Sequence, residues 1–172
     1  MKLAAIVAIV LSGAPAAAAQ GFTFPSIDGG TIDLADFAGR PVLVSNTASL
    51  CAFTPQYDAL QALHDRYRDR GLVVLAVPSD SFRQELGSAE AVREFCELTF
   101  GLDLPMTDIT EVRGRGAHPF YRWLADTHGV APAWNFAKVL IGPDGGYVAD
   151  WGPTVSPTAP EITARIEALL PE

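Results

Sequence analysis

Residues 42–57 read VLVSNTASLCAFTPQY, and this stretch decides the fold around it. Its first half begins with the apolar run Val42-Leu43-Val44, and we interpret it as a strand that is buried on both faces of a sheet. Cys51 follows in a short turn, and Thr54 and Pro55 then favour a helix start, with threonine as N-cap and proline at the first helical position. The amides at a helix N-terminus favour an anion, and the thiolate is the reactive form of cysteine. The stretch therefore predicts a nucleophilic sulfur between a strand and a helix.

The rest of the chain predicts alternating strands and helices. We expect a β-hairpin over residues 22–37, strands over 41–48 and 72–77, a second hairpin over 135–141 and 147–151, and helices over 55–69, 89–100, 119–127 and 160–170. This order indicates an α/β domain with a thioredoxin-like fold, in which an N-terminal β-hairpin precedes a central mixed sheet flanked by helices. The sequence shows no internal repeat and no second domain.

The N-terminus predicts a secretory signal. Lys2 precedes a short apolar run, and Ala17-Ala18-Ala19 offers a cleavage site. We expect residues 1–19 to be a signal peptide and residues 20–172 to be the mature domain, exported across the inner membrane into the periplasm. The alternative is that the apolar run forms an N-terminal helix of the fold. The run is shorter than the roughly 20 residues that span a bilayer.

Charge and cysteine content narrow the function. The formal net charge is −8, which argues against nucleic acid and anionic lipid surfaces as partners. The chain has two cysteines, Cys51 and Cys96, and in an oxidising compartment a structural disulfide is an alternative for them. The three histidines do not form a pattern that suggests a metal site or a catalytic triad. We therefore expect no metal and no cofactor.

Five sequence blocks follow one another in an order and spacing that match a known family. They are NTASLC with FTPQY at residues 46–57, GLVVL at 71–75, FRQE at 82–85, GAHP at 116–119, and WNF followed by lysine at 134–138. Together they cover roughly residues 22–170 and resemble the glutathione peroxidases. The resemblance implies an enzyme that reduces hydrogen peroxide and organic or lipid hydroperoxides to water or alcohols. The peroxide would oxidise the cysteine to a sulfenic acid.

The resemblance also implies a set of site residues. The family combines a cysteine or selenocysteine with a glutamine, a tryptophan and an asparagine, which here fall on Cys51, Gln84, Trp134 and Asn135. Amide and indole N–H groups are donors that suit a thiolate and a leaving oxygen. The loop before Gln84 is one residue shorter than the family pattern, so Gln84 could reach the sulfur by a different path. Taken singly, Gln84 could be a surface residue and Trp134 a core residue.

Two routes could reduce the sulfenic acid. An external thiol such as glutathione could attack it directly, or Cys96 could form a disulfide with it that a thioredoxin-like protein then reduces. Cys96 lies in the helix expected to hold a resolving cysteine, but one position away from the usual place. The helical spacing of Val92, Phe95, Cys96 and Thr99 turns Cys96 toward the core, so a buried core thiol is the favoured alternative.

Further expectations concern assembly, neighbouring residues and competing functions. Tetrameric members of the family that this chain resembles share a long insertion in the region between Ala125 and Trp134. This chain lacks the insertion, and the resemblance therefore implies a monomer or weak dimer with an open site. Arg83 and Lys138 could bind an anionic thiol, and His118 is expected to be structural. The competing functions are a thiol-disulfide oxidoreductase, which normally has C-x-x-C where this chain has Thr54, and a non-enzymatic peroxide sensor.

Overall fold

The structure is a computed structural model that describes residues 19–171. The predicted signal peptide therefore lies outside the described residues, apart from Ala19. Ala19 is buried, and its amide donates a 2.7 Å hydrogen bond to the Gly145 carbonyl oxygen. Within residues 19–171, no helix has the length and apolar character needed to cross a membrane.

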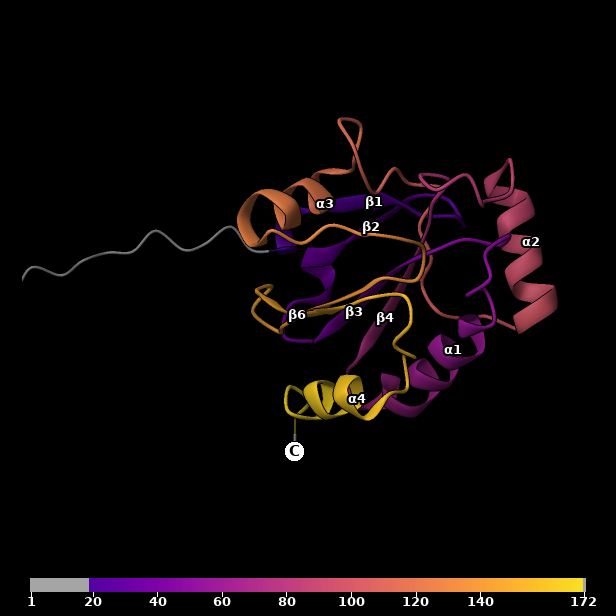
Figure 1. The fold of residues 1–172 in the computed structure, drawn as a ribbon. Coiled ribbons are helices and arrows are strands. Elements are labelled where there is room, and N and C mark those ends of the chain that lie inside the picture. The colour runs from indigo at the N-terminus through magenta and orange to yellow at the C-terminus, as the bar shows by residue number, and fades with distance from the viewer. Residues whose placement is uncertain (1–18, 172) are drawn as a thin grey trace, which may run out of the picture.

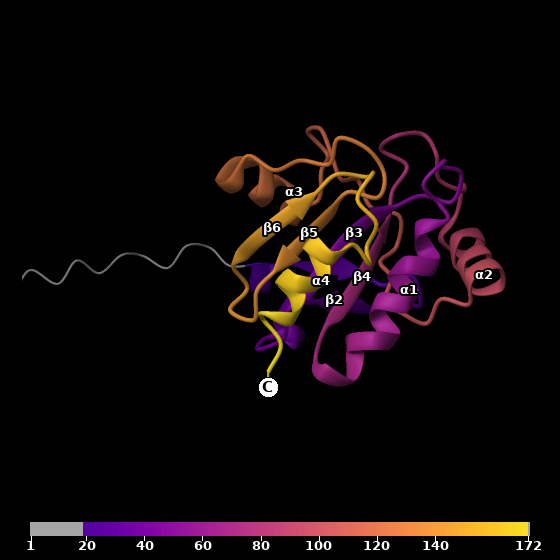
Figure 2. The same ribbon diagram turned by 60° about the horizontal axis from the view of Figure 1, so that its bottom comes forward.

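A mixed four-stranded sheet forms the centre of the molecule (Figure 2). Its order is β4-β3-β5-β6, with β3 at Val42–Thr47, β4 at Val73–Pro78, β5 at Lys138–Ile141 and β6 at Tyr147–Trp151. β3 pairs with β4 in parallel and with β5 in antiparallel register, so Val44 lies between Leu75 and Val139. Every residue of β3 and β4 is buried, as the continuous apolar run predicts.

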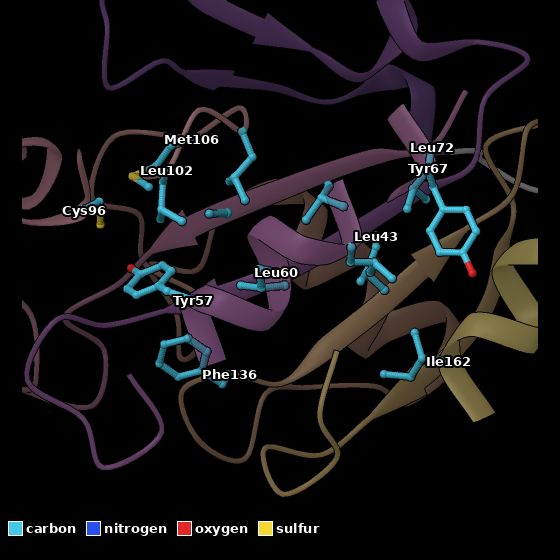
Figure 3. Packing of buried hydrophobic residues seen from close by; sticks show 14 of the residues in the cluster. Leu43, Tyr57, Leu60, Tyr67, Leu72, Cys96, Leu102, Met106, Phe136 and Ile162 are labelled. Atoms are coloured by element: carbon cyan, nitrogen blue, oxygen red, sulfur yellow. The ribbon is translucent and has the colours of Figure 1, made fainter. Parts of the chain in front are cut away.

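Helices cover both faces of this sheet. Figure 1 shows α3 (Pro119–Trp123) and the hairpin of β1 (Thr23–Pro25) and β2 (Thr31–Asp33) above it, and α1 (Gln56–Tyr67) and α4 (Pro160–Glu167) below it. Each face has its own core. Leu43 and Val74 pack with residues of α1, α4 and α2 (Ala89–Phe100), whereas Val44 and Leu75 pack with α3 and the hairpin. Figure 3 shows the first of these cores.

The predicted elements are present, and several are shorter than expected. α2 has the predicted bounds, since Ser88 caps it and Gly101 ends it in the left-handed region. The second arm of the first hairpin ends early because the Asp33 carboxylate accepts the Ala35 amide and starts a 3₁₀ turn over Leu34–Phe37. α3 passes into a π-helical turn, Leu124–His128, and α4 ends at Glu167. β5 begins at Lys138 and not at residue 135, because Phe136 has a φ of 63° and leaves extended geometry.

Candidate active site

Cys51 lies in the turn between β3 and α1, where the sequence predicts a nucleophile. The residue is 7% exposed, and its Sγ atom accepts a 3.4 Å hydrogen bond from the Phe53 amide. This donor favours negative charge on sulfur, as a thiolate requires. Neither Cys51 nor Cys96 is in a disulfide in this structure.

Thr54 has a different role from the predicted N-cap. α1 begins at Gln56 with Pro55 as N-cap, and no side chain caps the helix. The Thr54 hydroxyl instead closes the Cys51 turn: it accepts the Cys51 amide at 3.1 Å and lies 2.6 Å from the Cys51 carbonyl oxygen. A threonine hydroxyl prefers a local backbone partner, and here the turn supplies one before the helix begins. Thr54 therefore shapes the turn that holds the sulfur.

Gln84 reaches the Cys51 turn despite its shortened loop. Its backbone carbonyl oxygen accepts a 2.9 Å hydrogen bond from the backbone amide of Leu50, the residue before Cys51. Arg83 takes a left-handed conformation, with a φ of 58°, and donates its amide to the Asp80 carbonyl oxygen. This tight turn brings Gln84 to the Cys51 turn and places backbone strain at Arg83.

Asn135 and Gln84 are in direct contact. The Asn135 side-chain nitrogen donates a 3.0 Å hydrogen bond to Gln84 Oε1, and Asn135 is fully buried. This contact uses the acceptor of Gln84 and one donor of Asn135. Because each amide carries two N–H donors, this contact does not use the NH₂ group of Gln84 or the second N–H of Asn135.

The segment around Trp134 is fixed from both sides. Asn46, on β3, donates its side-chain amide to the Trp134 carbonyl oxygen at 3.1 Å, and its own carbonyl oxygen accepts the Phe136 amide. The indole is 39% exposed and packs against Phe82, with ring centroids 5.1 Å apart. The ring of Phe136 packs edge-on against Tyr57 and is buried. This packing holds Phe136 in a conformation that non-glycine residues rarely adopt.

The contacts thus join some of the predicted site residues and not others. Gln84 and Asn135 are paired, and the backbone of Gln84 joins the Cys51 turn. Trp134 contacts Phe82, which belongs to the loop of Gln84. Within residues 19–171, the hydrogen bond to the Cys51 sulfur comes from the Phe53 backbone and not from these three side chains. Their catalytic roles stay predictions.

Two residues of the Gln84 loop gain an importance that the sequence analysis did not assign. Phe82 supports the Trp134 indole, and Glu85 is buried and accepts the Ser49 amide at 3.0 Å. Both belong to the FRQE block, but their side chains carry no signal that separates them from ordinary loop residues. Glutamate side chains are mostly exposed to solvent, so the sequence predicts a solvated Glu85. Only the fold shows that Glu85 is buried.

Cys96 lies in the core, as its helical spacing predicts. The residue is 1% exposed, and burial raises the pKa of its thiol to about 11. It lines a cleft of about 280 Å³ with Ile27, Leu102 and Met106, and the other predicted site residues do not line this cleft. Figure 3 shows the hydroxyl end of Tyr57 directed toward the side of the core that holds Cys96.

The two basic residues considered for an anionic thiol differ in exposure. Lys138 is fully buried, and its ammonium donates to Gln56 Oε1 and to the Val155 carbonyl oxygen. The expectation that Lys138 could bind an external anion is therefore wrong, because β5 turns the side chain toward the start of α1. Arg83 is exposed.

The structure gives His118 a structural role, as expected. Its Nδ1 atom accepts the Phe120 amide at the start of α3, and Nε2 lies 2.9 Å from the Thr23 carbonyl oxygen. Its ring stacks on Phe24 with centroids 4.0 Å apart. Burial lowers the pKa of His118, so the neutral ring that these contacts require is favoured. Among residues 19–171, no cluster of three or more histidine, cysteine or acidic side chains could hold a metal ion.

Comparisons of the sequence with known proteins show which family it matches. The family model described as glutathione peroxidase matches residues 20–125. The hydroperoxy fatty acid reductase gpx1 of Synechocystis sp. is 40% identical over 161 residues, covering 87% of this chain and 94% of the relative. The thioredoxin/glutathione peroxidase BtuE of Escherichia coli is 35% identical over 169 residues, covering 84% and 92%.

A solved structure extends the agreement to the fold. The crystal structure of Trgpx in apo form superposes with a TM-score of 0.70 at 30% identity, covering 90% of this chain and 96% of that one. The predicted thioredoxin-like fold and the predicted family are both confirmed. This chain belongs to the glutathione peroxidase family of peroxidases.

Proposed function

We propose that the protein is a thiol peroxidase that reduces hydrogen peroxide and organic or lipid hydroperoxides at Cys51, by way of a sulfenic acid. The observation that carries this proposal is the Cys51 turn. Its sulfur accepts the Phe53 amide, and the adjacent Leu50 amide binds the loop that brings in Gln84 and Asn135. The sulfur and the amide donors thus belong to one group of linked loops.

The chemistry of the first step follows from these groups. The Cys51 thiolate attacks one peroxide oxygen, the O–O bond breaks, and the other oxygen leaves as an alkoxide or hydroxide that takes up a proton. The sulfur is thereby oxidised to the sulfenic acid and the peroxide is reduced to an alcohol or water. The remaining N–H donors of Gln84 and Asn135 are suited to the developing charge on the leaving oxygen.

We further propose that an external thiol reduces the sulfenic acid. A thiol forms a mixed disulfide with Cys51 and releases water, and a second thiol then restores Cys51 and leaves as the disulfide. The burial of Cys96 favours this route over an internal disulfide, because a buried thiol of raised pKa is a poor nucleophile. Glutathione and a thioredoxin-like protein are both candidate reductants, and the relatives' names include both.

The lipid part of the substrate range rests on the relative named as a hydroperoxy fatty acid reductase and on exposed apolar side chains of the loops that form the candidate site. Leu50 is 61% exposed and Trp134 is 39% exposed. We also propose that the enzyme is a monomer that acts in the periplasm, because of the predicted signal peptide and the short segment before Trp134.

A coupled assay tests this function. Purified residues 20–172 receive hydrogen peroxide or a fatty acid hydroperoxide with either glutathione and its reductase or thioredoxin and its reductase, and oxidation of NADPH is followed. We expect continuous turnover by the wild-type protein and none by Cys51→Ser, with the first added oxygen found on Cys51 by mass spectrometry. Peroxide consumption by Cys51→Ser at the wild-type rate would exclude the proposal. One oxidation event without turnover under any reductant would identify a sensor instead.

A further inference from the structure

Glu85 is a buried carboxyl group that connects the two loops of the candidate active site. Its Oε1 atom accepts the Ser49 amide at 3.0 Å and the Leu86 amide at 2.9 Å, and the residue is 8% exposed. Ser49 lies two residues before Cys51, and Glu85 directly follows Gln84. We call the hydrogen bond from the Ser49 amide to Glu85 Oε1 the Glu85 link.

The Glu85 link is one of the hydrogen bonds that hold these loops together. The other joins the Leu50 amide to the Gln84 carbonyl oxygen, so consecutive residues of one loop bind consecutive residues of the other. The Glu85 amide is itself held by Asp80 Oδ1 at 3.1 Å, within the shortened loop. The carboxyl group is therefore fixed in its own loop while it holds the Cys51 turn.

The surroundings of Glu85 are unusual for a residue with only a structural role. Its second oxygen, Oε2, is buried without a hydrogen-bond partner in the described structure. Burial raises the pKa of the carboxyl group, although hydrogen bonds from Ser49 and Leu86 oppose this shift. Three titratable groups interact electrostatically with the Glu85 carboxyl group: Asp80 in its own loop, Tyr57 on α1 and Cys96 on α2. Burying an ionised carboxyl group is costly unless hydrogen bonds compensate for the lost water, and the Ser49 and Leu86 amides supply such bonds at Oε1.

We propose that Glu85 is a positioning residue for peroxide reduction: its ionised carboxyl group holds the Cys51 turn in register with Gln84 and Asn135. A hydrogen bond from an N–H group to a carboxylate is shorter and stronger than one to a neutral acceptor. The ionised Glu85 side chain therefore holds the Ser49 amide more firmly than the protonated side chain does. A displacement of about 1 Å between reacting groups can slow a reaction about 100-fold. This role rests on the proposed function of Cys51.

Three variants separate positioning from simple stability. Glu85→Ala removes the link, Glu85→Gln keeps an acceptor oxygen without the charge, and Ser88→Ala removes the N-cap of α2, whose hydroxyl accepts the Ala91 amide. The readout is the rate of Cys51 oxidation by hydrogen peroxide in a single turnover, measured by rapid quenching, thiol alkylation and mass spectrometry. Circular dichroism at the same temperature checks that each variant is folded.

We expect Glu85→Ala to slow oxidation about 10- to 100-fold and Ser88→Ala to leave it unchanged. Glu85→Gln should lie between wild type and Glu85→Ala at neutral pH. The ratio of the wild-type rate to the Glu85→Gln rate should rise with pH as Glu85 ionises, because only the wild type gains the stronger bond.

Several results would overturn the proposal. A wild-type rate in Glu85→Ala would show that the link does not position the sulfur, and equal slowing in all three variants would show that only loop stability matters. A ratio that stays constant with pH would exclude a role for the charge. These failures are distinct from failure of the proposed function, which would appear as peroxide consumption by Cys51→Ser and would overturn both.

Discussion

The side-chain amide of Asn135 donates a 3.0 Å hydrogen bond to Gln84 Oε1, across 51 positions of sequence. Each of these side chains therefore depends on the other for its orientation. Asn135 is supported by a segment fixed to β3, and Gln84 by a loop bound to the Cys51 turn. The pair should act in catalysis as one unit.

The first prediction concerns this unit. Asn135→Ala should slow single-turnover oxidation of Cys51 by about two orders of magnitude, as expected when a charge-stabilising donor is lost. Because Gln84 orients Asn135, Gln84→Ala should slow the reaction by a similar amount. Residues in contact are not additive, so the double variant should be little slower than either single variant. Fully additive losses, measured in a double-mutant cycle, would contradict the coupling. Gln61→Ala, which removes an exposed amide bonded to Asp103, is the matched control.

The second prediction concerns Cys96. One equivalent of peroxide should leave the Cys96 thiol free, because the residue is buried and burial raises its pKa to about 11. Cys96→Ala should keep both single-turnover oxidation and turnover with the preferred reductant. Non-reducing peptide mapping measures the outcome. A quantitative Cys51–Cys96 disulfide would show that α2 opens to release a resolving cysteine, since the two Cα atoms must come within about 4.4–6.8 Å.

The third prediction concerns the buried ammonium of Lys138. Burial lowers its pKa from 10.5 to about 8. Between these pH values the unfolded chain binds more protons than the folded protein, so this residue should make the free energy of unfolding rise with pH. The slope should be at most about 1.4 kcal/mol per pH unit. Below about pH 8 both states are protonated and the contribution is constant.

Lys138→Met tests this linkage. Urea denaturation of the wild type and the variant from pH 7 to pH 10 gives the difference in free energy of unfolding at each pH. The difference should change in favour of the wild type above about pH 8, and the titration of Tyr57 and Tyr121 cancels because both proteins contain them. Parallel curves over the whole range would show that Lys138 titrates normally.

The fourth prediction concerns Arg83, which has a φ of 58° and an exposed side chain. Glycine adopts this conformation without steric cost, so Arg83→Gly should be about 1 kcal/mol more stable than Arg83→Ala. Thermal unfolding measures the difference. Both variants lose the guanidinium group, so an equal drop in their turnover with glutathione would show that Arg83 binds the anionic thiol. Equal stability of the two variants would show that the loop relaxes out of the left-handed region.

The candidate site shows where sequence reasoning succeeds. Cys51 is in the predicted turn because strand and helix signals on either side of it are local. Thr54 was identified as important but given the wrong partner, since a hydroxyl can bond to whichever backbone group the turn presents. Lys138 was expected to be accessible, yet its burial depends on contacts with α1 and the segment before α4, which no local pattern records.

The sequence alone determined the order of elements, the two faces of the sheet and the position of the reactive cysteine, because apolar periodicity, helix caps and turn residues act over a few neighbouring positions. Only the tertiary structure decided that Asn135 meets Gln84, that Glu85 binds Ser49 and that Lys138 donates to Gln56 and Val155. These contacts join segments that lie far apart in the chain. Their geometry depends on how β3, β5 and the helices pack, and the left-handed conformations of Arg83 and Phe136 persist because that packing holds them.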